Sequence, residues 1–231
     1  MNPIDSRHLN KYDSYTRRLD RPGKYRYRIN YLGPGLEAFQ SGPEYELVVQ
    51  PSKREAQRQH SVRVSYDEKA RHFRAEPPLL EVAAGDLVQW FKPDRKGGPF
   101  SVSGTSEEEV SFDSRRLDMG SIYSHTFLLP GVYGYRNTLG TTKEGAGTVR
   151  VQSAGPDRDA WVERLKQPAL VVFTKGSFNP PEVEIVVGGT VVWAVQDDVG
   201  ITVVVEEARR EGRIIQRTIG RPRPRRGRAK E

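Results

Sequence analysis

The sequence contains no cysteine. A chain without thiols can form no disulfide, offers no thiolate nucleophile and has no cysteine thiolate to coordinate a metal. Long apolar runs are also missing, and no stretch approaches the roughly 20 residues that a membrane-spanning helix needs. Residues 1–31 are polar and lack the apolar core of a secretory signal, which is about 7 to 15 residues long. With Met1 as the native start, we expect a cytoplasmic protein that has no membrane span.

The first 207 residues carry almost no net charge. The segment Ala208–Glu231 carries ten Arg or Lys residues and two Glu, a net charge of +8, while the whole chain carries +7. Residues 1–207 are therefore close to neutral, at −1. The basic character belongs to a tail and not to the folded body, which bears on the choice of partners.

The remaining composition favours an all-β protein. The 231 residues include 22 Gly and 16 Pro, and valine- and tyrosine-rich runs are separated by turn residues. Ser61–Tyr66 alternates as a half-buried strand does, and two further strands are expected at Leu79–Ala83 and Leu87–Phe91. The pattern predicts one helix, Asp157–Gln167, with Asp157 or Asp159 as its cap, and we expect it to bridge two units.

Two kinds of segment occur twice in the chain. Pro77–Trp90 (PPLLEVAAGDLVQW) matches Pro180–Trp193 (PPEVEIVVGGTVVW), and Tyr123–Tyr135 (YSHTFLLPGVYGY) matches Tyr15–Tyr27 (YTRRLDRPGKYRY). Residues 61–152 contain one segment of each kind, whereas each end of the chain contains only one. A half barrel exposes unpaired strand edges and an apolar face, so each half needs a partner.

We therefore predict that the two chain ends meet and complete a second, circularly permuted barrel around an inserted central one. A domain-swapped dimer, in which the halves pair between chains, is the alternative. The predicted parts are a back half at 1–52, a complete unit at 53–153, a linker helix at 154–167, a front half at 168–219 and a basic tail at 220–231.

The repeated pattern resembles that of a known family. Pro-Pro, an apolar strand, Gly-Asp and Val-x-Trp, followed by Pro-Gly-x-Tyr-x-Tyr and Gly-x-Val-x-Val, are similar to the plastocyanin, halocyanin and azurin group of cupredoxins. The resemblance covers about 90 residues of the central unit and, with its halves reordered, most of the rest. It implies an all-β chain of two Greek-key barrels or sandwiches. It also implies copper held by two histidines, a cysteine and a weak axial methionine.

Each position that the resemblance assigns to a copper ligand, where it can be placed, holds a residue that cannot bind copper. In the central unit these positions are Phe100, Asn137, Gly140 and Gly145, and in the permuted unit they are Ile201 and Ile29. We therefore expect no cofactor. The four histidines lack any ligand spacing and are expected on the solvated surface: His8, His60, His72 and His125. No catalytic motif is present, so we do not expect an enzyme.

Basic residues mark the candidate binding surfaces. The tail Arg217–Glu231 (RTIGRPRPRRGRAKE) has too many prolines and charges to form a helix or a central strand. Arg26 and Arg28 alternate with tyrosines, so we expect the tyrosines in the core and the arginines outside. The partner-binding candidates are thus Arg26, Arg28, Arg217, Arg221, Arg223, Arg225, Arg226, Arg228 and Lys230.

The leading hypothesis is a non-catalytic structural or protein-interaction protein, whose tail anchors it to an acidic protein or to a larger assembly of its own. Nucleic-acid binding through the tail and the Arg26 and Arg28 face is one alternative. A copper-binding or electron-transfer protein with an unconventional histidine site is another. Homo-oligomerisation is compatible with all three.

Overall fold

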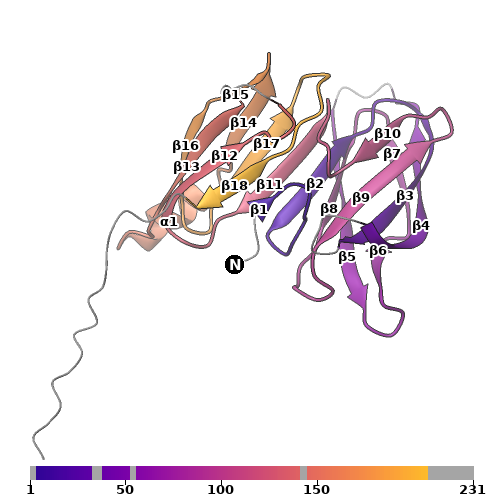
Figure 1. Ribbon diagram of the computed structural model, residues 1–231, viewed down its shortest axis with the longest axis horizontal. Coiled ribbons are helices and arrows are strands. Elements are labelled where there is room, and N and C mark those ends of the chain that lie inside the picture. The colour runs from indigo at the N-terminus through magenta and orange to yellow at the C-terminus, as the bar shows by residue number, and fades with distance from the viewer. Residues whose placement is uncertain (1–3, 33–37, 53–55, 141–144, 208–231) are drawn as a thin grey trace, which may run out of the picture.

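The computed structural model describes residues 4–32, 38–52, 56–140 and 145–207 (Figure 1). Eighteen strands and one short helix occupy this part of the chain, so the predicted all-β class is confirmed. The strands form three sheets, of five, five and eight strands. The helix is too short and too polar to cross a membrane, and no other helix occurs in the described ranges.

The order of the strands in each sheet is as follows. One five-stranded sheet runs β10 (Ser111–Asp113), β9 (Phe100–Ser106), β3 (Gly23–Leu32), β4 (Ala38–Gln50) and β7 (Leu79–Ala83). The other runs β1 (Ile4–Asp5), β18 (Val204–Glu207), β12 (Gly131–Arg136), β13 (Ala146–Gln152) and β16 (Glu182–Val186). The eight-stranded sheet runs β15 (Ser177–Asn179), β14 (Ala169–Thr174), β17 (Thr190–Val195), β11 (Ser121–Thr126), β2 (Asp13–Arg18), β8 (Leu87–Phe91), β5 (Gln59–Asp67) and β6 (His72–Glu76).

Each five-stranded sheet packs on one half of the eight-stranded sheet, which gives two sandwiches side by side (Figure 1). Aromatic rings join the layers: the Trp90 ring lies 5.4 Å from that of Tyr27, and the Trp193 ring lies 5.5 Å from that of Tyr135. Both tryptophans are fully buried. We call the unit around Trp90 the N-terminal sandwich and the unit around Trp193 the C-terminal sandwich.

The strand pairings correct the predicted arrangement of the halves. The back half at 1–52 supplies β3 and β4, which pair with β9 and β7 of the following segment and not with residues 168–219. In the same way, β12 and β13 pair with β18 and β16. Each sandwich is therefore built mainly from consecutive chain, and neither barrel is inserted in the other. A short connection, such as that from Gln50 to Gln59, keeps neighbouring halves together.

The two sandwiches share a pair of antiparallel strands at the middle of the eight-stranded sheet. β2 pairs with β11 in a register that sets Tyr15 opposite Tyr123 and Ser14 opposite Ser124. Tyr15 and Tyr123 are equivalent residues of the repeat, so this pairing has an approximate twofold axis through them. The two repeats thus meet as the subunits of a symmetric dimer do, but within one chain.

The predicted capped helix is present as α1 (Arg158–Leu165). The Asp157 side chain accepts hydrogen bonds from the backbone N–H groups of Asp159 and Ala160, and Trp161 Nε1 donates to the Val187 carbonyl at 3.0 Å. The helix connects β13 to β14, so it joins the two halves of the C-terminal sandwich and does not bridge two units.

Candidate functional site

Three of the six positions that the resemblance assigns to copper ligands lie in the core, and the six are grouped differently from the prediction. Phe100 and Ile29 lie on the paired strands β9 and β3 of the N-terminal sandwich, and both are 0% exposed. Ile201 is also 0% exposed and lies in the C-terminal sandwich. Fully buried apolar side chains therefore occupy these three of the positions that the resemblance assigns to ligands.

The other three positions join Ile201 at one end of the C-terminal sandwich. Asn137 Oδ1 accepts hydrogen bonds from the backbone N–H groups of Leu139 at 3.0 Å and Thr202 at 3.1 Å, and the Asn137 N–H donates to the Gly145 carbonyl at 2.7 Å. A Cβ atom on Gly140 would lie 3.0 Å from Asn137 Nδ2. These residues close a loop and do not fit copper. No cluster of three metal-ligating side chains occurs in the described ranges.

Replacing Asn137 should therefore reduce stability. Asn137→Ala removes the acceptor of two backbone N–H groups, one of them on the fully buried Thr202. We expect the free energy of unfolding to fall by about 1–3 kcal/mol in a urea titration. Leu139→Ala is the control, because this side chain is 54% exposed and its loss should change stability by less than about 0.5 kcal/mol. Equal effects of the two substitutions would contradict a structural role for the amide.

A buried ammonium group organises the corresponding end of the N-terminal sandwich. Lys92 is 1% exposed, its Nζ donates to the carbonyls of Lys96 at 2.8 Å and Gly98 at 2.5 Å, and it lies 5.3 Å from the centre of the Phe73 ring. Burial lowers the pKa of Lys92 to about 8. The loop between β8 and β9 is thus fastened by a cation that belongs to the chain itself.

Lys92 predicts a stability change at alkaline pH. Its pKa is lower in the folded state than the ordinary 10.5, so the unfolded chain binds more protons between about pH 8 and 10. Stability should therefore rise with pH in this window relative to Lys92→Met. The comparison is made as the difference in unfolding free energy between the two proteins, because the buried tyrosines are common to both. A constant difference from pH 7 to pH 10 would contradict the assignment.

The predicted basic face holds paired charges. Tyr25 and Tyr27 are buried as expected, and Arg26 and Arg28 are exposed. Both arginines lie near Glu44, at 3.6 and 3.3 Å. Arg26 and Arg28 line a groove that Asp113, Asp118 and Asp198 also line. The surface is therefore not a free cationic stripe for nucleic acid. The candidates from Arg217 to Lys230 lie outside the described residues.

The expectation of solvated histidines is wrong for three of the four, because His60 and His125 pair with carboxylates and His8 Nε2 is buried. His60 Nε2 lies 2.9 Å from Asp86 Oδ2, and His125 Nδ1 lies 2.6 Å from Asp13 Oδ1. The His125 side chain is only 12% exposed and that of Asp13 is 2% exposed. Neither carboxylate is near its histidine in sequence. The pairing of β2 with β11 brings Asp13 and His125 together. His8 Nε2 has no hydrogen-bond partner among the described residues, and burial lowers the pKa of His8.

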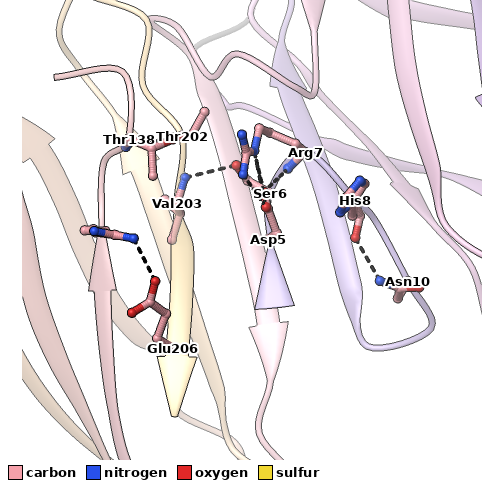
Figure 2. Close-up of polar contacts among 10 residues, drawn as sticks. Asp5, Ser6, Arg7, His8, Asn10, Thr138, Thr202, Val203 and Glu206 are labelled. Carbon is pink, nitrogen blue, oxygen red and sulfur yellow. Dashed lines mark hydrogen bonds and ion pairs between the residues drawn. The ribbon is translucent and has the colours of Figure 1, made fainter. Parts of the chain in front are cut away.

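The first strand crosses from one sandwich to the other (Figure 2). β1 precedes the N-terminal sandwich but pairs with β18 of the C-terminal one, with Ile4 opposite Val205. The Ser6 N–H donates to the Val203 carbonyl at 2.9 Å, and the Val203 N–H donates to Ser6 Oγ at 3.0 Å. Arg7 holds the turn by a forked contact with Asp5, at 2.9 and 2.7 Å. The chain then returns to pair Leu9 with Phe100.

The second repeat makes the reciprocal crossing with the same residues. The Ser114 N–H donates to the Val102 carbonyl at 2.8 Å, the Val102 N–H donates to Ser114 Oγ at 2.9 Å, and Arg115 forks onto Asp113. Leu117 then pairs with Ile201. Sequence reasoning missed this exchange. The signal was present, because IDSRHL (Ile4–Leu9) and FDSRRL (Phe112–Leu117) lie 108 residues apart, as Tyr15 and Tyr123 do.

A cleft of about 610 Å³ opens beside the shared strands, on the side of Asp13 and His125. The Asp13 carboxylate accepts hydrogen bonds from the Asn10 N–H at 2.7 Å and the Tyr123 hydroxyl at 2.9 Å, in addition to its contact with His125. Burial raises the pKa of Tyr123, so this hydroxyl remains a donor. At this cleft, the sequence-distant groups Asp13 and His125 meet an accessible cavity.

Comparison of the chain with protein-family models, curated proteins and solved structures gives no match.

Proposed function

We propose that this protein is a non-catalytic interaction scaffold: two metal-free, cupredoxin-like sandwiches that present a basic tail to an acidic protein partner. The observation that carries the proposal is the burial of Phe100, Ile29 and Ile201, each at 0% exposure, in the positions where the resemblance expects metal ligands. Apolar side chains at these positions support the packing of the sandwich, but they offer no atom that could bind copper.

The connection between the sandwiches supports a scaffold role. A continuous sheet and two exchanged segments link the units, so their relative orientation is held by backbone hydrogen bonds on several strands. Such a connection differs from a flexible linker, across which relative motion of the domains is the default. A rigid pair of sandwiches fixes the distance and direction between any surfaces that it presents.

The charge distribution supports an acidic partner for the tail. The segment from Ala208 carries +8 while the rest of the chain is at −1, and Arg26 lies near Glu44 on the folded body. Attraction through a dense arginine segment is mainly electrostatic and weakens with salt.

Affinity capture from native extract tests this proposal. Full-length protein and a version that ends at Gly220 are compared at about 50 and about 500 mM salt, with and without nuclease treatment. We expect an acidic protein to be retained only by the full-length chain at low salt, with nuclease having no effect. A lone protein under all conditions would contradict the proposal. Retention that nuclease abolishes would favour the nucleic-acid alternative.

A further inference from the structure

The cleft beside Asp13 and His125 has features that the scaffold role does not require. Its walls come from the segment that precedes β2, from the loop between β8 and β9 and from the turn between β11 and β12. Residues from both sandwiches thus contribute to one cavity of about 610 Å³, a size within the usual range for small-molecule sites.

The floor of the cleft presents a fixed hydrogen-bond acceptor. A carboxylate accepts only, so the contact with Asp13 places a proton on His125 Nδ1, and in the neutral ring Nε2 is then an acceptor. The ring packs edge-on against Phe127, with centroids 4.8 Å apart, which fixes its orientation. His125 lines the cleft, and Nε2 has no hydrogen-bond partner among the described residues.

The repeat itself shows that this pair is not needed to join the sandwiches. The approximate twofold axis relates Asp13 to Ser121 and His125 to Arg17. At that other end of the shared strands, Arg17 pairs with Asp118 and donates to Ser121 Oγ at 3.0 Å, so an ordinary ion pair closes the junction. The buried acid and histidine occur at one end only, and they line the cleft there.

The rim combines positive charge with apolar surface. Lys11 Nζ lies 5.4 Å from the centre of the Tyr12 ring, and the Arg95 guanidinium carbon lies 5.8 Å from it. Within the described ranges, neither cation forms an ion pair. Leu128 and Leu129 are 43% and 39% exposed at the same rim. Unpaired cations next to an aromatic and aliphatic wall complement an anion with a flat apolar body.

We propose that the cleft binds a small hydroxylated aromatic acid. Its carboxylate lies between Lys11 and Arg95, its ring packs against Tyr12 and Leu129, and its hydroxyl donates to His125 Nε2. The carboxylate supplies the charge that the rim lacks, and the hydroxyl satisfies the acceptor on the floor. This binding site is additional to the proposed scaffold function and does not depend on it.

A calorimetric or NMR titration of the full chain tests the site with three related probes. These are 3-(4-hydroxyphenyl)propanoate, 3-phenylpropanoate without the hydroxyl, and 4-ethylphenol without the carboxylate. We expect the first to bind with a dissociation constant of about 1 mM or below, and each of the others at least about tenfold more weakly. No binding of the first probe up to about 10 mM, or equal affinity for all three, would overturn the proposal.

Two variants separate specific recognition from general charge. Lys11→Gln with Arg95→Gln should weaken the first probe by about tenfold or more and leave 4-ethylphenol unchanged. The charge-matched control, Arg63→Gln with Lys69→Gln, removes two exposed cations from β5 and the turn after it, and should retain full affinity. An equal loss in both double variants would overturn the assignment to the cleft. Because all four side chains are exposed, the comparison does not depend on the tolerance of the core.

Discussion

Deletion of residues 1–7 should lower the free energy of unfolding of the C-terminal sandwich by about 4 kcal/mol. The deletion removes the β1–β18 pairing and both hydrogen bonds between Ser6 and Val203, at roughly 1 kcal/mol for each hydrogen bond. It also uncovers the edge of β18 beside the buried Val203 and Val205. Chemical denaturation, followed by fluorescence of Trp161 and Trp193 in a Trp90→Phe background, measures the loss.

The Ser6→Ala variant provides a graded comparison for this deletion. It retains β1 but leaves the Val203 N–H without its acceptor in a buried position, so we expect a loss of about 1–3 kcal/mol. Ser114→Ala makes the equivalent change at Val102 and should cost a similar amount in the N-terminal sandwich. A deletion mutant as stable as the full chain would show that the crossing segment contributes nothing.

A break in the chain at Glu108 should leave the two fragments associated. The cut falls in the exposed turn between β9 and β10, yet β10 stays paired with β9 and β1 with β18 on opposite sides of it. The five residue pairs of β2 and β11 also cross the cut. Fragments 1–108 and 109–231 should therefore elute together and give one 1:1 complex by native mass spectrometry.

We call the two exchanged segments, Ile4–Leu9 and Phe112–Leu117, the arms. The arms determine how tightly the fragments hold together. Fragment 8–108 lacks β1, and its complex with 109–231 should dissociate at a lower denaturant concentration than the complex of 1–108 does. Salt should have little effect on either complex, because the shared strands and the exchanged segments are joined by backbone hydrogen bonds. Separation of intact fragments into two folded monomers would contradict the exchanged arrangement.

Local features of the fold could be predicted from the sequence. The strands at Leu79–Ala83 and Leu87–Phe91 have the expected bounds, and the capping residue Asp157 was among the two proposed. Alternation and turn residues act over a few positions, so the sequence displays them directly. The burial of Tyr25 and Tyr27 follows from the same alternation.

The choice of partners between the halves could not be predicted in the same way. Because the repeats are equivalent, β3 and β12 offer similar edges, and the pattern alone does not decide which of them receives β9. The repeated Asp-Ser-Arg at Asp5 and Asp113 would have located the crossing segments, but not their direction. The contact of Asp13 with His125 depends on the register of β2 and β11 and has no local signal.

Disulfide trapping tests the central claim, the reciprocal exchange, most directly. The chain has no cysteine of its own, so each pair of introduced thiols reports one contact. Asp5 lies opposite Val204, and Asp113 lies opposite Ser103. We predict that Asp5→Cys with Val204→Cys and Asp113→Cys with Ser103→Cys form intramolecular disulfides under mild oxidation. Asp113→Cys with Val204→Cys and Asp5→Cys with Ser103→Cys should remain reduced, whereas disulfides in these pairs alone would show that each arm stays on its own sandwich.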